Sequence, residues 1–145
     1  MFKSILGLEG WEVLEWLKPP GEYHFVSRYT VVPDTCPKCA VFEPRLYVHA
    51  WKDQQFRDTG FHGKHVSIIV QRPRYKCREC GETFQQPLPD MDERRFMTKR
   101  LLTWIGDRAL KRTFAEVAAD VGVDEKTVRL IFADHVRALE AKRRA

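Results

Sequence analysis

The sequence predicts an α+β fold, with a β-rich domain over residues 1–89 and a domain of three helices over residues 90–145. Three observations lead to this prediction. Apolar and polar residues alternate over segments of the first half, whereas apolar residues recur every three or four positions in the last third. A proline-rich stretch at residues 86–90 separates the two patterns. Two closely spaced pairs of cysteines lie within the β-rich part.

Two pairs of extended segments are predicted before the proline-rich stretch. Residues 11–18 and 22–32 flank a Pro-Pro-Gly sequence whose backbone angles suit a turn, so we expect a hairpin there. Residues 46–51 and 64–75 form a second β region, with a turn in the glycine-containing residues 58–63.

Three helices are predicted after residue 90. Apolar spacing indicates the first over residues 98–111. Thr113 begins the second, because Glu116 three positions later completes a capping box, and Gly122 ends it. Asp124 caps a third, longer helix. The residues expected on one face of that third helix are Val128, Phe132, His135 and Leu139.

The composition predicts a soluble, globular protein. Of the 145 residues, 43% are hydrophobic, which is enough for a folded core. No apolar run approaches the length of a membrane helix, and the N-terminus lacks the pattern of a signal peptide, so we expect no membrane partner and a cytoplasmic location. The net charge of +5 favours a polyanionic partner, although most charged residues are expected to be ordinary solvated surface.

The cysteines form two pairs, each with a gap of two residues: Cys36 with Cys39, and Cys77 with Cys80. This spacing lets a tight turn direct two thiolates at one tetrahedral ion, so we expect all four to bind one structural Zn²⁺ per chain. Four sulfur ligands leave no open position for water, which excludes a catalytic role for that zinc. The alternatives are four buried thiols or a redox pair, and the presence of two pairs disfavours the redox interpretation.

Two further groups could hold a metal. His62 and His65 stand at a ligand spacing, but four thiolates already complete a tetrahedron. Asp90, Asp92 and Glu93 could suggest a magnesium site, but they border the proline-rich stretch, and we expect a solvated start of a helix there.

Residues 114–131 predict a helix-turn-helix. Ala118 allows close approach of two helices, Gly122 makes the sharp turn, and Val123, Val128 and Ile131 bury the inner face of the second helix of the pair. The side chains left near the start of that helix would reach base edges in the major groove; they are Glu125, Lys126, Thr127 and Arg129. The alternative is a small helical bundle in which the glycine serves packing alone.

Basic residues around this segment are expected to hold DNA phosphates. The residues assigned to this role are Lys99, Arg100, Arg112 and Arg137, with Arg94, Arg95, Arg108 and Lys111 nearby.

The order of motifs resembles the N-terminal region of insertion-sequence transposases of the ISL-three family. The motifs are Cys36-Pro37-Lys38-Cys39, Arg57-Asp58 with His62-Gly63-Lys64, Arg74-Tyr75-Lys76-Cys77 with Cys80-Gly81 and Phe84, and Met97-Thr98-Lys99-Arg100-Leu101. The resemblance implies a zinc ribbon and a helix-turn-helix that recognises the terminal inverted repeats of the element. It also implies a prokaryotic, nucleoid-associated protein and, further along the chain, an RNase-H-like catalytic domain.

The sequence predicts no catalytic residues. An RNase-H-like core needs several strands and separated carboxylates, and no strands are expected after residues 86–90, before the chain stops at Ala145. The chain is therefore expected to be a non-catalytic binder, whether a truncated transposase, a fragment or a separate protein derived from such an element.

The leading hypothesis is a sequence-specific binder of double-stranded DNA at transposon ends, acting alone, as a homodimer or with a catalytic transposase. A zinc-ribbon helix-turn-helix regulator of transcription is an alternative. A second alternative is a protein-interaction module. The apolar surface of such a module would be formed by Phe2, Ile5, Leu6, Trp11 and Trp16. A nuclease active on its own is the least expected reading.

Overall fold

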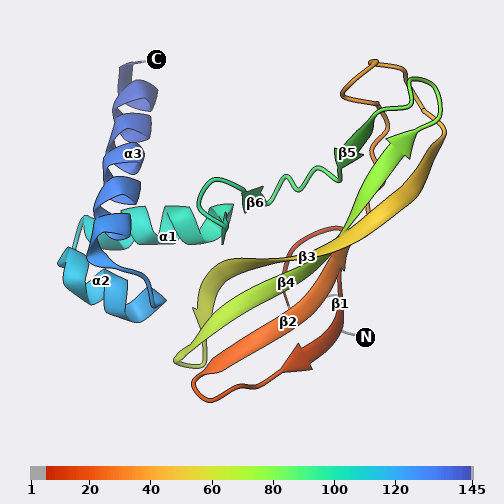
Figure 1. Cartoon of the computed structure of the whole chain (residues 1–145). Coiled ribbons are helices and arrows are strands. Elements are labelled where there is room, and N and C mark those ends of the chain that lie inside the picture. The colour runs from red at the N-terminus through yellow and green to blue at the C-terminus, as the bar shows by residue number, and fades with distance from the viewer. Residues whose placement is uncertain (1–5, 145) are drawn as a thin grey trace.

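The computed structural model describes residues 6–144, and Phe2 and Ile5 lie outside them. The described chain is α+β, with a β-sheet region followed by three helices (Figure 1). The strands are β1 (Trp11–Leu17), β2 (Glu22–Tyr29), β3 (Leu46–Phe61), β4 (Lys64–Cys77), β5 (Thr83–Gln85), β6 (Met91–Asp92) and β7 (Met97–Thr98). The helices are α1 (Lys99–Ala109), α2 (Phe114–Val121) and α3 (Glu125–Arg144). None of these helices combines the length and the apolar character needed to cross a membrane.

The sheet has the strand order β1-β2-β4-β3-β7-β6, with β5 beside β4. The predicted hairpin at the Pro-Pro-Gly sequence is confirmed, since β1 and β2 pair antiparallel. β3 continues to Phe61, ten residues past the predicted end of that segment, and a two-residue turn of His62 and Gly63 joins it to β4. Both turn residues have positive φ, 50° and 70°, which matches the right-handed twist of a tight hairpin.

The proline-rich stretch lies against the sheet. The buried side-chain amide of Gln86 donates hydrogen bonds to the carbonyls of Tyr29 (2.8 Å) and Val31 (3.0 Å). Leu88 and Met91 are buried in the same apolar core as the strands. The residues that form this first core are Leu6, Trp11, Val13, Phe25, Phe56, Val66, Ile68, Val70, Leu88 and Met91.

The prediction that only helices follow residue 90 was wrong. β6 and β7 pair with each other, and Met97 of β7 pairs with Arg57 of β3. Strands of two residues are too short to produce an alternating pattern, so the sequence gives no sign of them.

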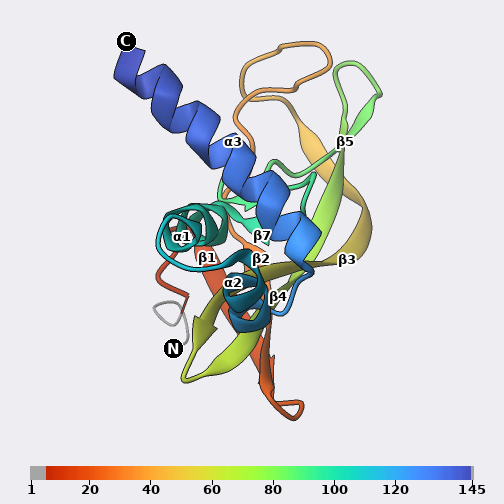
Figure 2. The same ribbon diagram turned by 90° about the vertical axis from the view of Figure 1, so that its left-hand side faces the viewer.

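The helices form a second core, and the predicted caps of α2 and α3 are confirmed. The hydroxyl of Thr113 accepts a hydrogen bond from the Glu116 N–H, Gly122 ends α2 with φ 81°, and Asp124 accepts from the Thr127 N–H at 3.0 Å. Val128 of α3 is buried in this core. The expected apolar face does not reach the end of α3, because its last turns project from the protein and leave Leu139 44% exposed (Figures 1 and 2).

A buried carboxylate joins the sheet to the helices. Asp58 of β3 is 4% exposed and accepts hydrogen bonds from the Thr98 hydroxyl (2.7 Å) and from Arg100 Nε (2.9 Å), with a second ion-pair contact to Arg100 Nη2. Thr98 is also the N-cap of α1, accepting from the Leu101 N–H. The carboxylate raises the pKa of the Arg100 guanidinium above its usual value. One side chain therefore fixes β7 and the start of α1 to the sheet.

Replacing Asp58 by Ala should lower the free energy of unfolding by about 3 kcal/mol, because it leaves the partly buried Arg100 cation without its partner. Urea unfolding followed by circular dichroism measures the change. Glu140→Ala, on the exposed end of α3, is the control and should change stability by less than about 0.5 kcal/mol. Equal stability of the two variants would contradict this role of Asp58.

Candidate metal centre and nucleic-acid interface

The four cysteines converge on one point. Cys36 and Cys39 lie in the loop at residues 30–45, Cys77 ends β4, and Cys80 lies in the loop at residues 78–82. All four Sγ atoms are within 4.8 Å of one another, and two of the distances are 3.8 Å (Cys36–Cys80) and 3.9 Å (Cys39–Cys77). Four sulfurs at about 2.3 Å from a tetrahedral zinc are about 3.8 Å apart, so the cluster has the dimensions of a Zn(Cys)₄ site.

The backbone explains the convergence. In the first turn the Ala40 N–H donates to the Cys36 carbonyl, and in the second the Gly81 N–H donates to the Cys77 carbonyl, both at 2.8 Å. Gly81 has φ 75° and Ala40 has φ 61°, so both turns end in the left-handed region. Ala40 thus adopts a backbone conformation that glycine favours.

The thiols have unequal acidity in the metal-free protein. Burial raises the pKa of Cys36, but hydrogen bonds from the backbone of Cys39 and Lys38 outweigh it and bring the pKa to about 7. The backbone of Val41 lowers the pKa of Cys39, but burial and the neighbouring thiols raise it to about 12. Zinc must displace protons from such thiols, so zinc binding weakens as the pH falls.

The acidic residues that were considered as a magnesium site have other partners. Asp90 accepts a hydrogen bond from the indole of Trp11 at 2.8 Å, Asp92 accepts from two backbone N–H groups, and Glu93 pairs with Arg72. These acids do not start a helix, because α1 begins only at Lys99, after β7. Within residues 6–144, the four cysteines are the group of metal-ligating side chains that lie within reach of one ion.

The α2–turn–α3 segment exposes the residues assigned to base contacts. The start of α3 exposes Glu125, Lys126 and Arg129. Thr127 is half-buried, and its backbone N–H donates to the capping side chain of Asp124. Arg129 lies 3.6 Å from Glu125 in an exposed ion pair. Figures 1 and 2 show this end of α3 directly after α2.

The residues assigned to phosphate contacts fall into two groups. Lys99 is exposed, Arg112 lies in an exposed pair with Glu116 at 3.6 Å, and Arg137 pairs with Asp134 on α3. Arg100 differs, because its guanidinium binds the buried Asp58 and also donates to the Leu6 carbonyl. The structure therefore gives Arg100 a role within the fold that the sequence did not indicate.

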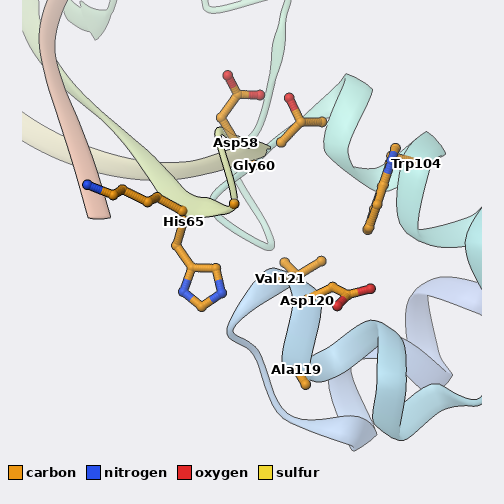
Figure 3. Close-up of a pocket in the computed structure, with 10 residues that line it drawn as sticks. Asp58, Gly60, His65, Trp104, Ala119, Asp120 and Val121 are labelled. Carbon is orange, nitrogen blue, oxygen red and sulfur yellow. The ribbon is translucent and has the colours of Figure 1, made fainter. Parts of the chain in front are cut away.

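The β3–β4 turn packs beside the helix-turn-helix. It borders a cleft of about 370 Å³ whose other wall is formed by Trp104 and the end of α2, and Figure 3 shows His65 extending toward that end. Arg57 donates to the carbonyl of Val121 at 3.2 Å, and a Cβ on Gly122 would lie 2.7 Å from the His65 ring. Arg57-Asp58 is a conspicuous pair in the sequence, but only the structure shows that its members contact α2 and α1, respectively.

The fold and the site together define a zinc-ribbon, helix-turn-helix protein. Comparison with protein families supports this class and shows which family the two domains match. Residues 33–80 match the zinc-finger of transposase IS204/IS1001/IS1096/IS1165, and residues 86–136 match the helix-turn-helix domain of transposase family ISL3. The chain thus contains the zinc-ribbon and helix-turn-helix domains of ISL3-family transposases. Neither matched domain is a catalytic one. Comparison with curated proteins and with solved structures found no match.

Purified protein should contain one zinc per chain, and Cys39→Ala should lose it, because three thiolates no longer close the tetrahedron. Inductively coupled plasma mass spectrometry measures the ratio of zinc to protein. His62→Ala is the matched control and should keep its zinc. A Cys39→Ala protein that still held one zinc would show that this thiol is not a ligand.

Gly122→Ala should destabilise the protein for two separable reasons. The left-handed backbone costs about 1–2 kcal/mol for a residue with a Cβ. The new Cβ would also clash with the His65 ring. In a His65→Ala background the same substitution should cost about 1 kcal/mol less, as measured by a double-mutant cycle in urea. Additive effects of the two substitutions would show that the His65 ring does not interact with residue 122.

Proposed function

We propose that this protein binds double-stranded DNA sequence-specifically and recognises the terminal inverted repeats of an insertion sequence, with α1, α2 and α3 acting as one helix-turn-helix domain. The observation that carries the proposal is the exposed start of α3, directly after a turn matched to the ISL3 helix-turn-helix. A DNA-binding protein of a prokaryotic insertion sequence would act in the cytoplasm, at the nucleoid.

The proposed base contacts come from the first turns of α3. Lys126 and Arg129 can donate to guanine, Glu125 can accept from the cytosine amino group, and Thr127 can contact either kind of base. Glu125 and Arg129 are more than half exposed, so their ion pair contributes little and can open when Arg129 contacts a base.

The proposed phosphate contacts come from Lys99, Arg112 and Arg137. The carboxylate partners of both arginines are partly or largely exposed, so exchanging a carboxylate for a phosphate costs little free energy. Arg100 is left out of this set, because opening its pair would leave Asp58 buried without a cation.

The zinc has a structural role in this proposal. When bound, it holds the two cysteine loops together through four thiolates and has no open position for water. Strand cleavage is therefore assigned to another protein or domain, and purified chain with Mg²⁺ should leave supercoiled plasmid intact.

Selection from a random DNA pool, followed by fluorescence anisotropy, tests the proposal. The slope of log affinity against log salt should be about −0.9 for each neutralised phosphate. Arg129→Ala should reduce discrimination at one base position, which costs about 1–3 kcal/mol, whereas Arg112→Ala should weaken all duplexes alike.

Lys18→Ala, in the loop between β1 and β2, is a charge-matched control and should bind like the parent. Failure to enrich any sequence, or identical binding by the parent and both arginine variants, would overturn the assignment.

A further inference from the structure

Three arginine side chains meet one carboxylate on α3. Asp134 accepts hydrogen bonds from Arg95 at 2.7 Å and from Arg94 at 3.2 Å, and it also pairs with Arg137, three residues further along the helix. Arg94 and Arg95 come from the turn between β6 and β7, and Figure 1 shows the segment after β6 beside α3. These four residues, which come from two separate segments, are called the arginine cluster below.

The arginine cluster carries more positive than negative charge. Its three guanidinium groups share the carboxylate of Asp134. Asp92 borders the same cleft, of about 250 Å³, and accepts hydrogen bonds from the backbone N–H groups of Arg94 and Arg95. Even with both carboxylates counted, three cations leave a surplus of one positive charge. An anion from outside the chain can supply the missing negative charge.

The arginine cluster is accessible to solvent, and its carboxylate is ionised. The side chain of Arg94 is 73% exposed and that of Asp134 is 37% exposed. Hydrogen bonds from Arg95 and Arg137 hold the pKa of Asp134 below its usual value, so the carboxylate is charged at neutral pH. Water screens ion pairs of this exposure, and a competing anion can therefore replace Asp134 at a small cost in free energy.

The arginine cluster adjoins the face of α3 that carries Lys126, one of the proposed base contacts. The exposed residues that follow one another on this face, at steps of four, three and four, are Lys126, Leu130, Ala133 and Arg137. Arg137 lies about 16 Å from Lys126 along the helix, at a rise of about 1.5 Å per residue. The major groove is about 12 Å wide, so a helix that reads bases at its start meets the phosphate backbone at that distance.

We propose that the three arginines of the cluster bind a phosphate of the DNA backbone, and that Asp134 occupies their site in the free protein and competes with that phosphate. The inference rests on the function proposed above and adds the turn between β6 and β7 to the DNA-binding surface. Asp134 holds the guanidinium groups together before DNA binds. It also lowers the affinity for every duplex alike, because phosphates carry no sequence information.

Fluorescence anisotropy with a selected duplex and with an unrelated duplex tests the competition. Asp134→Asn should bind both duplexes about fivefold more tightly than the parent chain, because the phosphate no longer has to displace exposed ion pairs, and fivefold corresponds to the stronger of such pairs. Glu140→Gln removes the same charge from the exposed end of α3 and should change the affinity by less than about twofold. Circular dichroism should be unchanged in both variants.

A cycle of variants separates competition from a general change of charge. The double variant Arg94→Gln, Arg95→Gln should lower the magnitude of the slope of log affinity against log salt by about 1. In that background Asp134→Asn should gain less than about twofold, because two of the three ion pairs that the phosphate displaces are already absent. An equal gain in the parent and in the double variant would overturn the proposal.

Retention on heparin, a sulfated polyanion without bases, tests the site independently of sequence recognition. Asp134→Asn should elute at higher salt than the parent chain and than Glu140→Gln. Elution of the two variants at the same salt concentration would overturn the proposal. A chain that selects no DNA sequence, but in which Asp134→Asn strengthens binding to heparin and to unrelated duplexes, would overturn only the function proposed above. A chain that selects a sequence without any gain from Asp134→Asn would overturn only this inference.

Discussion

The relation between the sheet and the helices depends on the buried carboxylate of Asp58. A carboxylate removed from water is tolerable only when it is paired and hydrogen-bonded, and Asp58 has both Thr98 and Arg100. Because Thr98 also caps α1, the same contacts that satisfy the charge set the direction in which the first helix leaves the sheet. The neighbouring Arg57 donates a hydrogen bond to the end of α2. Two consecutive residues of β3 therefore contact the helical domain, one at α2 and one at α1.

The metal centre and the helices stabilise opposite ends of one β-ladder. The cysteine loops close the end at which Leu46 pairs with Cys77, and the contacts to α1 and α2 lie near the turn at the other end, as Figures 1 and 2 show. The zinc site therefore does not touch the helix-turn-helix. The β3–β4 ladder connects the two ends, with register shifts between Val48 and Ala50 and between Asp58 and Phe61.

The arginines fall into two kinds, those bound to groups within the fold and those in exposed ion pairs. Arg100 and Arg72 are bound to groups within the fold. Arg72 is itself buried, and removing Arg100 would leave the buried Asp58 without a cation. Arg112, Arg129 and Arg137 form pairs with exposed or partly exposed carboxylates, in which water screens the attraction. We propose that arginines of the second kind are the ones that meet DNA phosphates and bases. Net charge could not reveal this distinction, since both kinds of arginine count equally.

The sequence by itself determined the zinc site, the order of β-rich and helical parts, and the helix caps, because each depends on residues a few positions apart. Two cysteines separated by two residues, or a threonine three positions before a glutamate, fix local geometry wherever they occur. The extension of β3 through polar residues, the two short strands after the proline-rich stretch and the burial of Gln86 were decided by tertiary structure. The roles of Asp58 and Arg100 were decided in the same way, since they are 42 residues apart and only the packing of α1 on β3 brings them together.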